Sequence, residues 1–235
     1  MSVSPRNLVI LAFAVLALAG CGVDNLDGVT LATAAIRPTN TPPPTTTPDP
    51  LAAALPNTTT KEFLDTTITL SYPEGWQTDE SGQYMIIADP NSATADLGGS
   101  GLSIFVSLTR RLNLETDTEN LAALAMQAFV REFVDRGFGN PDSVPNLDQT
   151  HAFAWGTHDA AIFAWQADDG SLDGIQLVVL DSDRRRFVLF SAQSPAEFWP
   201  EFYPTIRAML ATVSLDDDVL PAADLLAAFE AISAS

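Results

Sequence analysis

Two histidines, several aspartates and three consecutive arginines are the side chains of this sequence that could do chemistry. His151 and His158, with Asp159 next to the second, offer two imidazoles and a carboxylate to a metal ion. Their spacing matches no zinc pattern, and a zinc site needs a fourth ligand that the sequence does not place within reach. We therefore interpret these histidines as strand-end or surface residues, and we predict no metal and no cofactor.

The remaining polar motifs point away from catalysis as well. Asp181 with Asp183, and the run 216–218, carry carboxylates, but neither follows the spacing and glycine placement of a calcium-binding loop. Residues 98–101 read Gly-Gly-Ser-Gly and lack the Gly-x-Ser-x-Gly spacing of a hydrolase nucleophile. We predict solvated turns at these positions and a protein that is not an enzyme.

Arg184, Arg185 and Arg186 form a cationic run in a strongly acidic chain. The sequence has 30 acidic and 11 basic residues and a net charge of −19. Such a charge repels nucleic acid. The run falls at an expected hairpin tip, where solvation is the default interpretation and docking to an acidic partner or lipid is the alternative. Arg110 and Arg111 would join this patch if the sheet brings the two ends together.

Cys21 is the single cysteine and stands in the stretch LALAGCG, residues 16–22. Before it come one basic residue, Arg6, and an apolar run over 8–19, which is shorter than the roughly 20 residues that span a bilayer. This layout is typical of a secretory signal peptide. An ordinary signal peptide would leave Cys21 as a free thiol, and this is the alternative to the lipid anchor described next.

The four residues 18–21, Leu-Ala-Gly-Cys, resemble the lipobox of bacterial lipoproteins. That resemblance implies a thiol alkylated by diacylglycerol and cleavage just before the cysteine. Two acyl chains hold a protein stably on a membrane, whereas one does so only marginally. We therefore expect residues 1–20 to be removed and membrane lipid to be a partner through acylated Cys21, on the extracytoplasmic face of a bacterial membrane.

Composition divides the rest of the chain. Residues 37–60 contain seven prolines and eight threonines. With no apolar periodicity they cannot bury enough surface to fold, and we interpret residues 21–60 as the anchor and an extended stalk. Residues 61–215 are predicted to form the folded domain. Residues 216–235 are predicted to be an acidic spacer followed by a peripheral helix.

Hydrophobic periodicity predicts an α+β domain. Strands are expected at 67–72, 84–88, 102–109, 151–155, 159–167, 174–181 and 186–193, the last two apolar on both faces and therefore central in the sheet. One helix is expected from a capping box at 116–119 to Arg136 and Gly137. A second is expected to be capped by Ser194 and to be regular over 203–213, and a third covers 222–232. This order favours an antiparallel sheet packed between helices.

The strand at 68–72 ends in Pro73-Glu74-Gly75-Trp76, and this stretch is similar to the opening of PsbP-like domains. The late hairpin and helix over 174–213 also fit that pattern. The resemblance covers residues 62–215 and implies an antiparallel sheet of about six to seven strands sandwiched between helices. It also implies a function in binding or assisting assemblies, since known members of the family do not catalyse reactions.

Two functional hypotheses therefore remain open, and an enzyme is a third that the sequence favours least. The favoured hypothesis is a lipid-anchored, monomeric accessory or binding module for a protein of the cell envelope. The alternative is a carrier of a small ligand or ion, which predicts a pocket between sheet and helix near Trp76, Trp155 or Trp165.

Overall fold

The structure is a computed structural model that describes residues 55, 57–63, 67–92, 99–112, 114, 120–181 and 185–233. The signal and lipidation predictions at residues 1–21, the capping box at 116–119 and Arg184 lie outside the described residues.

A seven-stranded antiparallel sheet forms the middle of the domain, with the strand order β3-β4-β5-β9-β8-β7-β6. Its strands are β3 (Gln77–Ser81), β4 (Tyr84–Ala88), β5 (Gly101–Leu108), β6 (His151–Trp155), β7 (His158–Gln166), β8 (Leu172–Asp181) and β9 (Arg186–Pro195). β9 is central and β8 is its neighbour, as their apolar pattern predicts. The expected α+β fold is confirmed.

A second, four-stranded sheet has the order β1-β2-β10-β11. It consists of β1 (Thr58–Phe63), β2 (Ile68–Pro73), β10 (Ser214–Leu215) and β11 (Asp218–Val219). β1 pairs with β2 along its whole length, from Thr58 opposite Pro73 to Phe63 opposite Ile68. The folded part therefore begins before residue 61, inside the Thr-rich segment that we interpreted as stalk.

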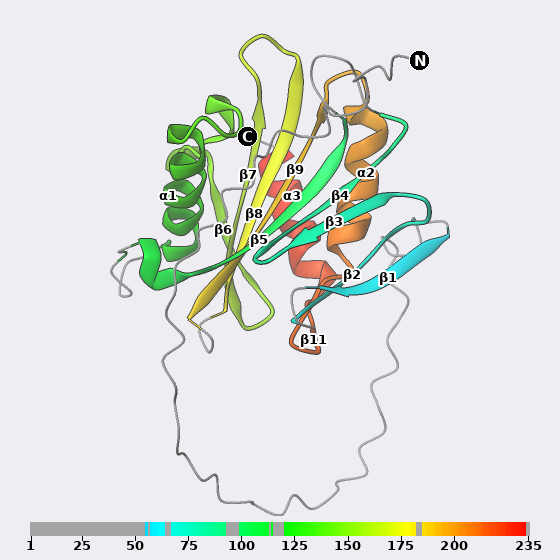
Figure 1. Cartoon of the computed structure of the whole chain (residues 1–235). Helices are drawn as coiled ribbons and strands as arrows, with labels where there is room; N and C mark the ends of the chain where they lie inside the picture. Colours follow the sequence, from blue (N-terminus) through cyan, green and yellow to red (C-terminus); the bar gives the residue numbers. More distant parts are fainter. Residues whose placement is uncertain are drawn as a thin grey trace, which may run out of the picture.

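Helices cover both faces of the large sheet (Figure 1). α1 (Leu121–Asp135) packs on one face, mainly against β7 and β8. α2 (Trp199–Leu210) and α3 (Ala222–Ser233) pack on the other face, together with the small sheet. Short 3₁₀ turns η2 (Thr109–Leu112), η3 (Pro141–Ser143) and η4 (Leu147–Gln149) lie between the main elements. Within the described ranges, none of the helices has the length and apolar character that crossing a bilayer requires.

Two elements differ from the sequence-based expectation near the carboxyl end. Ser194 does not cap α2: β9 continues through Pro195, and the Ser194 hydroxyl shares a 2.7 Å hydrogen bond with that of Ser100. The helix begins at Trp199 and continues through Pro204. α3 is not peripheral, because Leu225 and Phe229 are buried in the main core. The domain therefore extends past residue 215 and includes the helix that the sequence predicts to be peripheral.

Candidate functional site

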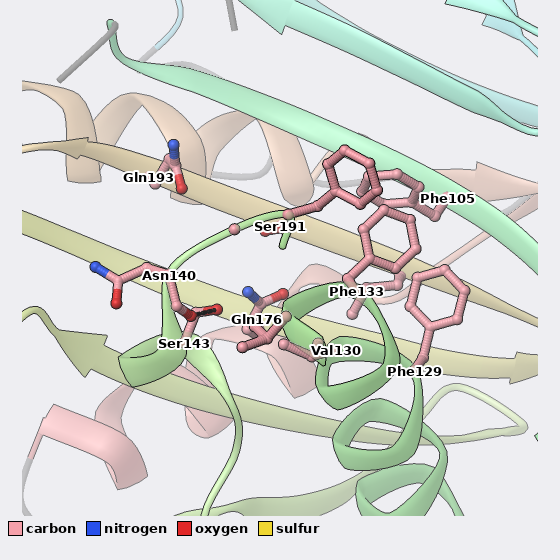
Figure 2. Close-up of a pocket in the computed structure, with 13 residues that line it drawn as sticks. Phe105, Phe129, Val130, Phe133, Asn140, Ser143, Gln176, Ser191 and Gln193 are labelled. Atoms are coloured by element: carbon pink, nitrogen blue, oxygen red, sulfur yellow. Dashed lines mark hydrogen bonds between the residues drawn. The ribbon is translucent and has the colours of Figure 1, made fainter. Parts of the chain in front are cut away.

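A hollow opens on the α1 side of the large sheet, where the helix no longer covers the strands (Figure 2). Its floor comes from β5, β8 and β9, one wall from the second half of α1, and the rim from the turn after that helix. The lining residues are Phe105, Phe129, Val130, Phe133, Val134, Phe138, Gly139, Asn140, Ser143, Gln176, Leu189, Ser191 and Gln193. No charged side chain is among these described lining residues.

The register of the strands explains why part of the floor is polar. Ser103 on β5 lies opposite Ser191 on β9, and Ser191 lies opposite Gln176 on β8. Side chains alternate between faces along each strand, so this polar row shares one face with the neighbouring row that contains Phe105 and Leu189. The boundary between the apolar and polar rows lies under the end of α1. The floor of the hollow is therefore apolar on one side of this boundary and polar on the other.

Gln176 is the unusual residue of this floor. Its side chain is 3% exposed, and its Oε1 atom has no hydrogen-bond partner among the described residues. A buried acceptor left without a donor costs about 1–3 kcal/mol. Figure 2 shows its amide between the rim residues Asn140 and Ser143 on one side and the phenylalanine side chains on the other. A group entering the hollow therefore meets the side chain of Gln176, while Oε1 itself is enclosed.

Four phenylalanines form the apolar wall, and each is partly exposed. Phe133 stands at the centre, with its ring centroid 5.1 Å from that of Phe105, 4.9 Å from that of Phe129 and 6.5 Å from that of Phe138. Phe129 also meets the buried Phe187 edge to face at 5.2 Å. The wall is thus anchored in the core while its outer rings remain open to contact.

The rim is a tight turn held by side-chain hydrogen bonds. Asn140 Oδ1 accepts a 2.9 Å bond from the backbone N–H of Asp142, and Ser143 Oγ donates a 2.7 Å bond to the carbonyl of Asn140. Gly139 has a φ of 80°, a left-handed conformation that glycine adopts without steric cost. These contacts fix the shape of the turn.

The size of the hollow limits what can enter it. It offers about 30 Å³ to water-sized molecules. One water needs roughly 10–15 Å³ on this measure, and pockets for small-molecule ligands take on the order of 300–1,000 Å³. The hollow therefore accepts the end of a side chain or a similarly small group, and not a whole ligand of drug size.

The tryptophans expected near a pocket lie elsewhere. Trp155 is fully buried, and its Nε1 donates a 3.0 Å hydrogen bond to the carbonyl of Pro221. Trp76 is partly buried and stacks on Phe202 with ring centroids 5.9 Å apart. Trp165 is 7% exposed and lies over Gly174. None of the three lines the hollow, whose aromatic residues are phenylalanines instead.

The arginines expected at the hairpin tip separate into different environments. Arg186 is 7% exposed, and its Nε and Nη2 atoms lie 2.8 Å and 2.7 Å from the carboxylates of Asp181 and Asp216. It is a buried ion-pair residue and is not available for docking. Arg185 is exposed, and its carbonyl accepts a 3.0 Å bond from the backbone N–H of Thr109, which brings the η2 residues next to it.

The candidate metal ligands have structural partners. His151 stacks on Phe153, and His158 Nδ1 lies 3.3 Å from the carbonyl of Leu180. Across the part of the chain that the structure describes, no three histidine, cysteine, aspartate or glutamate side chains converge as a metal site requires.

In the exposed turn between β7 and β8, the side chain and backbone of Ser171 hydrogen-bond to Asp169 and lower the pKa of its carboxyl.

The architecture resembles solved structures more clearly than the sequence resembles known sequences. No protein-family model and no curated protein sequence matches this chain. Cyanobacterial PsbP from Synechocystis sp. PCC 6803 superimposes with a TM-score of 0.50 at 12% identity, over 67% of this chain and 92% of that one. The chain has the PsbP-like fold.

Two further structures are similar to the PsbP-like domain at lower scores. The Ran-binding protein Mog1p of Saccharomyces cerevisiae has a TM-score of 0.43 at 12% identity, over 68% of this chain and 96% of that one. LpqN of Mycobacterium tuberculosis, described as involved in cell envelope biogenesis, has a TM-score of 0.43 at 14% identity, over 68% and 91%.

Proposed function

We propose that this protein is an exported lipoprotein, held on a bacterial membrane through acylated Cys21, whose PsbP-like domain is a non-catalytic binding module for a protein of the cell envelope. The partner docks on the phenylalanine wall and inserts one side chain into the hollow. The single observation that carries this proposal is the wall of four partly exposed phenylalanines beside a recess whose floor holds the buried amide of Gln176.

The energetics support a docking role for this recess. Buried polar atoms in folded proteins nearly always have a hydrogen-bond partner, either in the protein or in ordered water. Protein interfaces also concentrate their binding energy in recessed aromatic spots that exclude water. The phenylalanine wall beside Gln176 combines these features in one place.

The same geometry favours a docking module over the carrier and the enzyme. The hollow's 30 Å³ is too little for a carried ligand of ordinary size. Its described lining holds no charged side chain for acid–base chemistry, and the Ser143 hydroxyl donates to a backbone carbonyl rather than to a base. A side chain delivered by a protein partner is the occupant that fits both the size and the chemistry.

The proposal is tested by in-cell cross-linking of the intact protein, affinity isolation from native membranes and mass spectrometry. Four forms are compared: wild type, Cys21→Ser, Gln176→Met and Gln149→Met. Methionine keeps the length of glutamine without its acceptor, and exposed Gln149 provides a matched surface control. We expect one reproducible partner with wild type and Gln149→Met, which Gln176→Met captures poorly.

The Cys21→Ser form tests the anchor separately. We expect it to appear in the soluble fraction and to lose the partner because it no longer concentrates at the membrane. A Cys21→Ser protein that remains fully membrane-bound would refute the lipid anchor. Equal capture by wild type and Gln176→Met would refute the hollow as the docking site.

A further inference from the structure

We infer that the outer edge of β6 binds a second copy of this chain, so that two large sheets join edge to edge across a two-fold axis at Phe153. This interface lies outside the hollow and involves none of its lining residues. Three features of β6 lead to the inference: its outward-facing backbone groups, its lack of charge and the symmetry of the groups that it offers.

The outward-facing backbone groups of β6 belong to Ala152 and Ala154. β6 is the last strand of the large sheet, and its neighbour is β7. Trp155 and His158 close a two-residue turn in which Gly156 has a φ of 63°. In such a hairpin the closing pair exchanges both backbone hydrogen bonds, and bonded pairs then alternate with non-bonded pairs along the strand.

The N–H and C=O groups of Ala152 and Ala154 therefore face away from β7. Across the described ranges, no other strand or side chain pairs with these groups. Both alanines are exposed, and their side chains are small. An added strand can therefore approach this edge of the sheet.

The β6 edge also lacks the charges that protect the opposite edge of the sheet. β3, at the other end of the strand order, carries exposed Asp79 and Glu80. Charged residues on an edge strand discourage the addition of another strand. β6 reads His-Ala-Phe-Ala-Trp and contains no carboxylate, lysine or proline. Of the two edges of the large sheet, β6 is therefore the one that is open to pairing.

The outward-facing groups of β6 are complementary to themselves. We place β6 of the second copy antiparallel, with Phe153 opposite its own counterpart. Ala152 then lies opposite Ala154 of the second copy, and Ala154 lies opposite Ala152. In this register every outward N–H of one copy meets an outward C=O of the other. A two-fold axis relates the two copies, which is the commonest symmetry of homo-oligomers.

The side chains of β6 favour the same register. Phe153 lies between His151 and Trp155, with ring centroids 6.2 Å and 6.4 Å away. Across the axis Phe153 meets the same ring of the second copy, and aromatic pairs of this kind stabilise neighbouring strands. β6 is already ordered in each copy, whereas an extended segment of another protein loses conformational freedom when it binds. The second copy is therefore the favoured occupant.

The size and charge of the chain make this association weak in dilute solution. Stable interfaces take on the order of 20–30 residues from each side, and β6 has 5. Each chain also carries a net charge of −19, which repels its copy. The pair is therefore best trapped covalently in cells, where the protein is at its own concentration.

The test uses disulfide trapping in cells that express the full chain. Ala152→Cys and Ala154→Cys are made separately, each with its own epitope tag. Ala227→Cys, an exposed alanine of α3, is the matched control. Residues directly opposite in a bonded pair have Cα atoms about 5.5 Å apart, which suits a disulfide, whereas diagonal residues are about 7–8 Å apart.

Co-expression of Ala152→Cys with Ala154→Cys should give a mixed disulfide dimer after brief oxidation with copper phenanthroline. We expect at least about fivefold more of it than either variant forms with itself, because each cysteine is diagonal to its own counterpart. Wild type, whose single cysteine is Cys21, gives the background. Thermal unfolding of the purified variants establishes that they are folded.

Three results would overturn the inference: no dimer above the Ala227→Cys level, equal yields from all pairings of the two variants, or disulfides to a different protein in place of a second copy. Capture of a partner through the hollow involves no residue of β6. The pairing of β6 and the proposed docking function can therefore each fail without the other.

Discussion

The indole ring of Trp165 lies directly over Gly174, its opposite neighbour on the adjacent strand. A Cβ atom built at residue 174 would come within 2.4 Å of the indole Cε2 and 2.5 Å of its Cζ2 and Nε1 atoms. The glycine is therefore required by the close approach of a ring, and not by its backbone conformation. The indole ring covers the sheet face beside the row of residues that forms the floor of the hollow.

Gly174→Ala should destabilise the domain by about 1–3 kcal/mol, since the added methyl overpacks a filled site. Urea unfolding measures the loss. In a double-mutant cycle with Trp165→Leu, the smaller side chain should make room for the methyl, so the alanine costs less in that background. Additive effects of the two substitutions would contradict the contact.

Gln176→Met should stabilise the domain by about 1 kcal/mol or more, because it removes a buried acceptor that has no hydrogen-bond partner among the described residues. The measurement is the midpoint of urea unfolding compared with wild type. Gln149→Met, on the surface, should stay within about 0.5 kcal/mol of wild type. A clear loss of stability in Gln176→Met would mean that the Gln176 amide already forms stabilising hydrogen bonds in the folded protein.

Arg186→Met should destabilise the domain by about 3–5 kcal/mol, because it removes the buried guanidinium whose Nε lies 2.8 Å from the carboxylate of Asp181. Arg185→Met changes an exposed neighbour and should alter stability by less than about 0.5 kcal/mol. Thermal unfolding of the two variants side by side measures the difference. Similar melting temperatures would show that the buried ion pair does not stabilise the fold.

The strands and helices could be predicted from the sequence where at least one face is buried. The apolar run of β8 and β9 identified the sheet centre, and the helical spacing of apolar residues identified α1. β3 was missed because its residues, Gln77–Ser81, are mostly exposed and show no apolar alternation. β1 was missed because its Thr-rich sequence reads as linker, and only pairing with β2 makes it a strand.

The hollow could not be predicted for a different reason. Gln176 stands in the run Ile175-Gln176-Leu177, where one polar residue among apolar ones carries little weight. The serines that share its row belong to β5 and β9, and only the register places them together. The signal that the sequence does contain is an isolated glutamine in a strand otherwise buried on both faces.

The Arg184–Arg186 run illustrates the same limit. Three consecutive arginines at a hairpin suggest one patch, but Arg185 lies in the turn with a φ of 51° and Arg186 already belongs to β9. Arg186 is the first residue of β9, and it meets Asp181 across the strand pair and Asp216 from the far end of the chain. Sequence spacing alone does not show which of three equal charges is buried.

The central claim is that a partner protein docks on the phenylalanine wall and fills the hollow. The most direct measurement is in-cell photo-crosslinking with p-benzoyl-phenylalanine in place of Phe138, which is partly exposed at the rim. The same photoreactive residue at position 149 provides the surface control. We predict one discrete cross-linked partner from position 138, absent from position 149 and lost when Gln176→Met is added. Identical cross-linking from both positions, or a product at 138 that is insensitive to Gln176→Met, would contradict the claim.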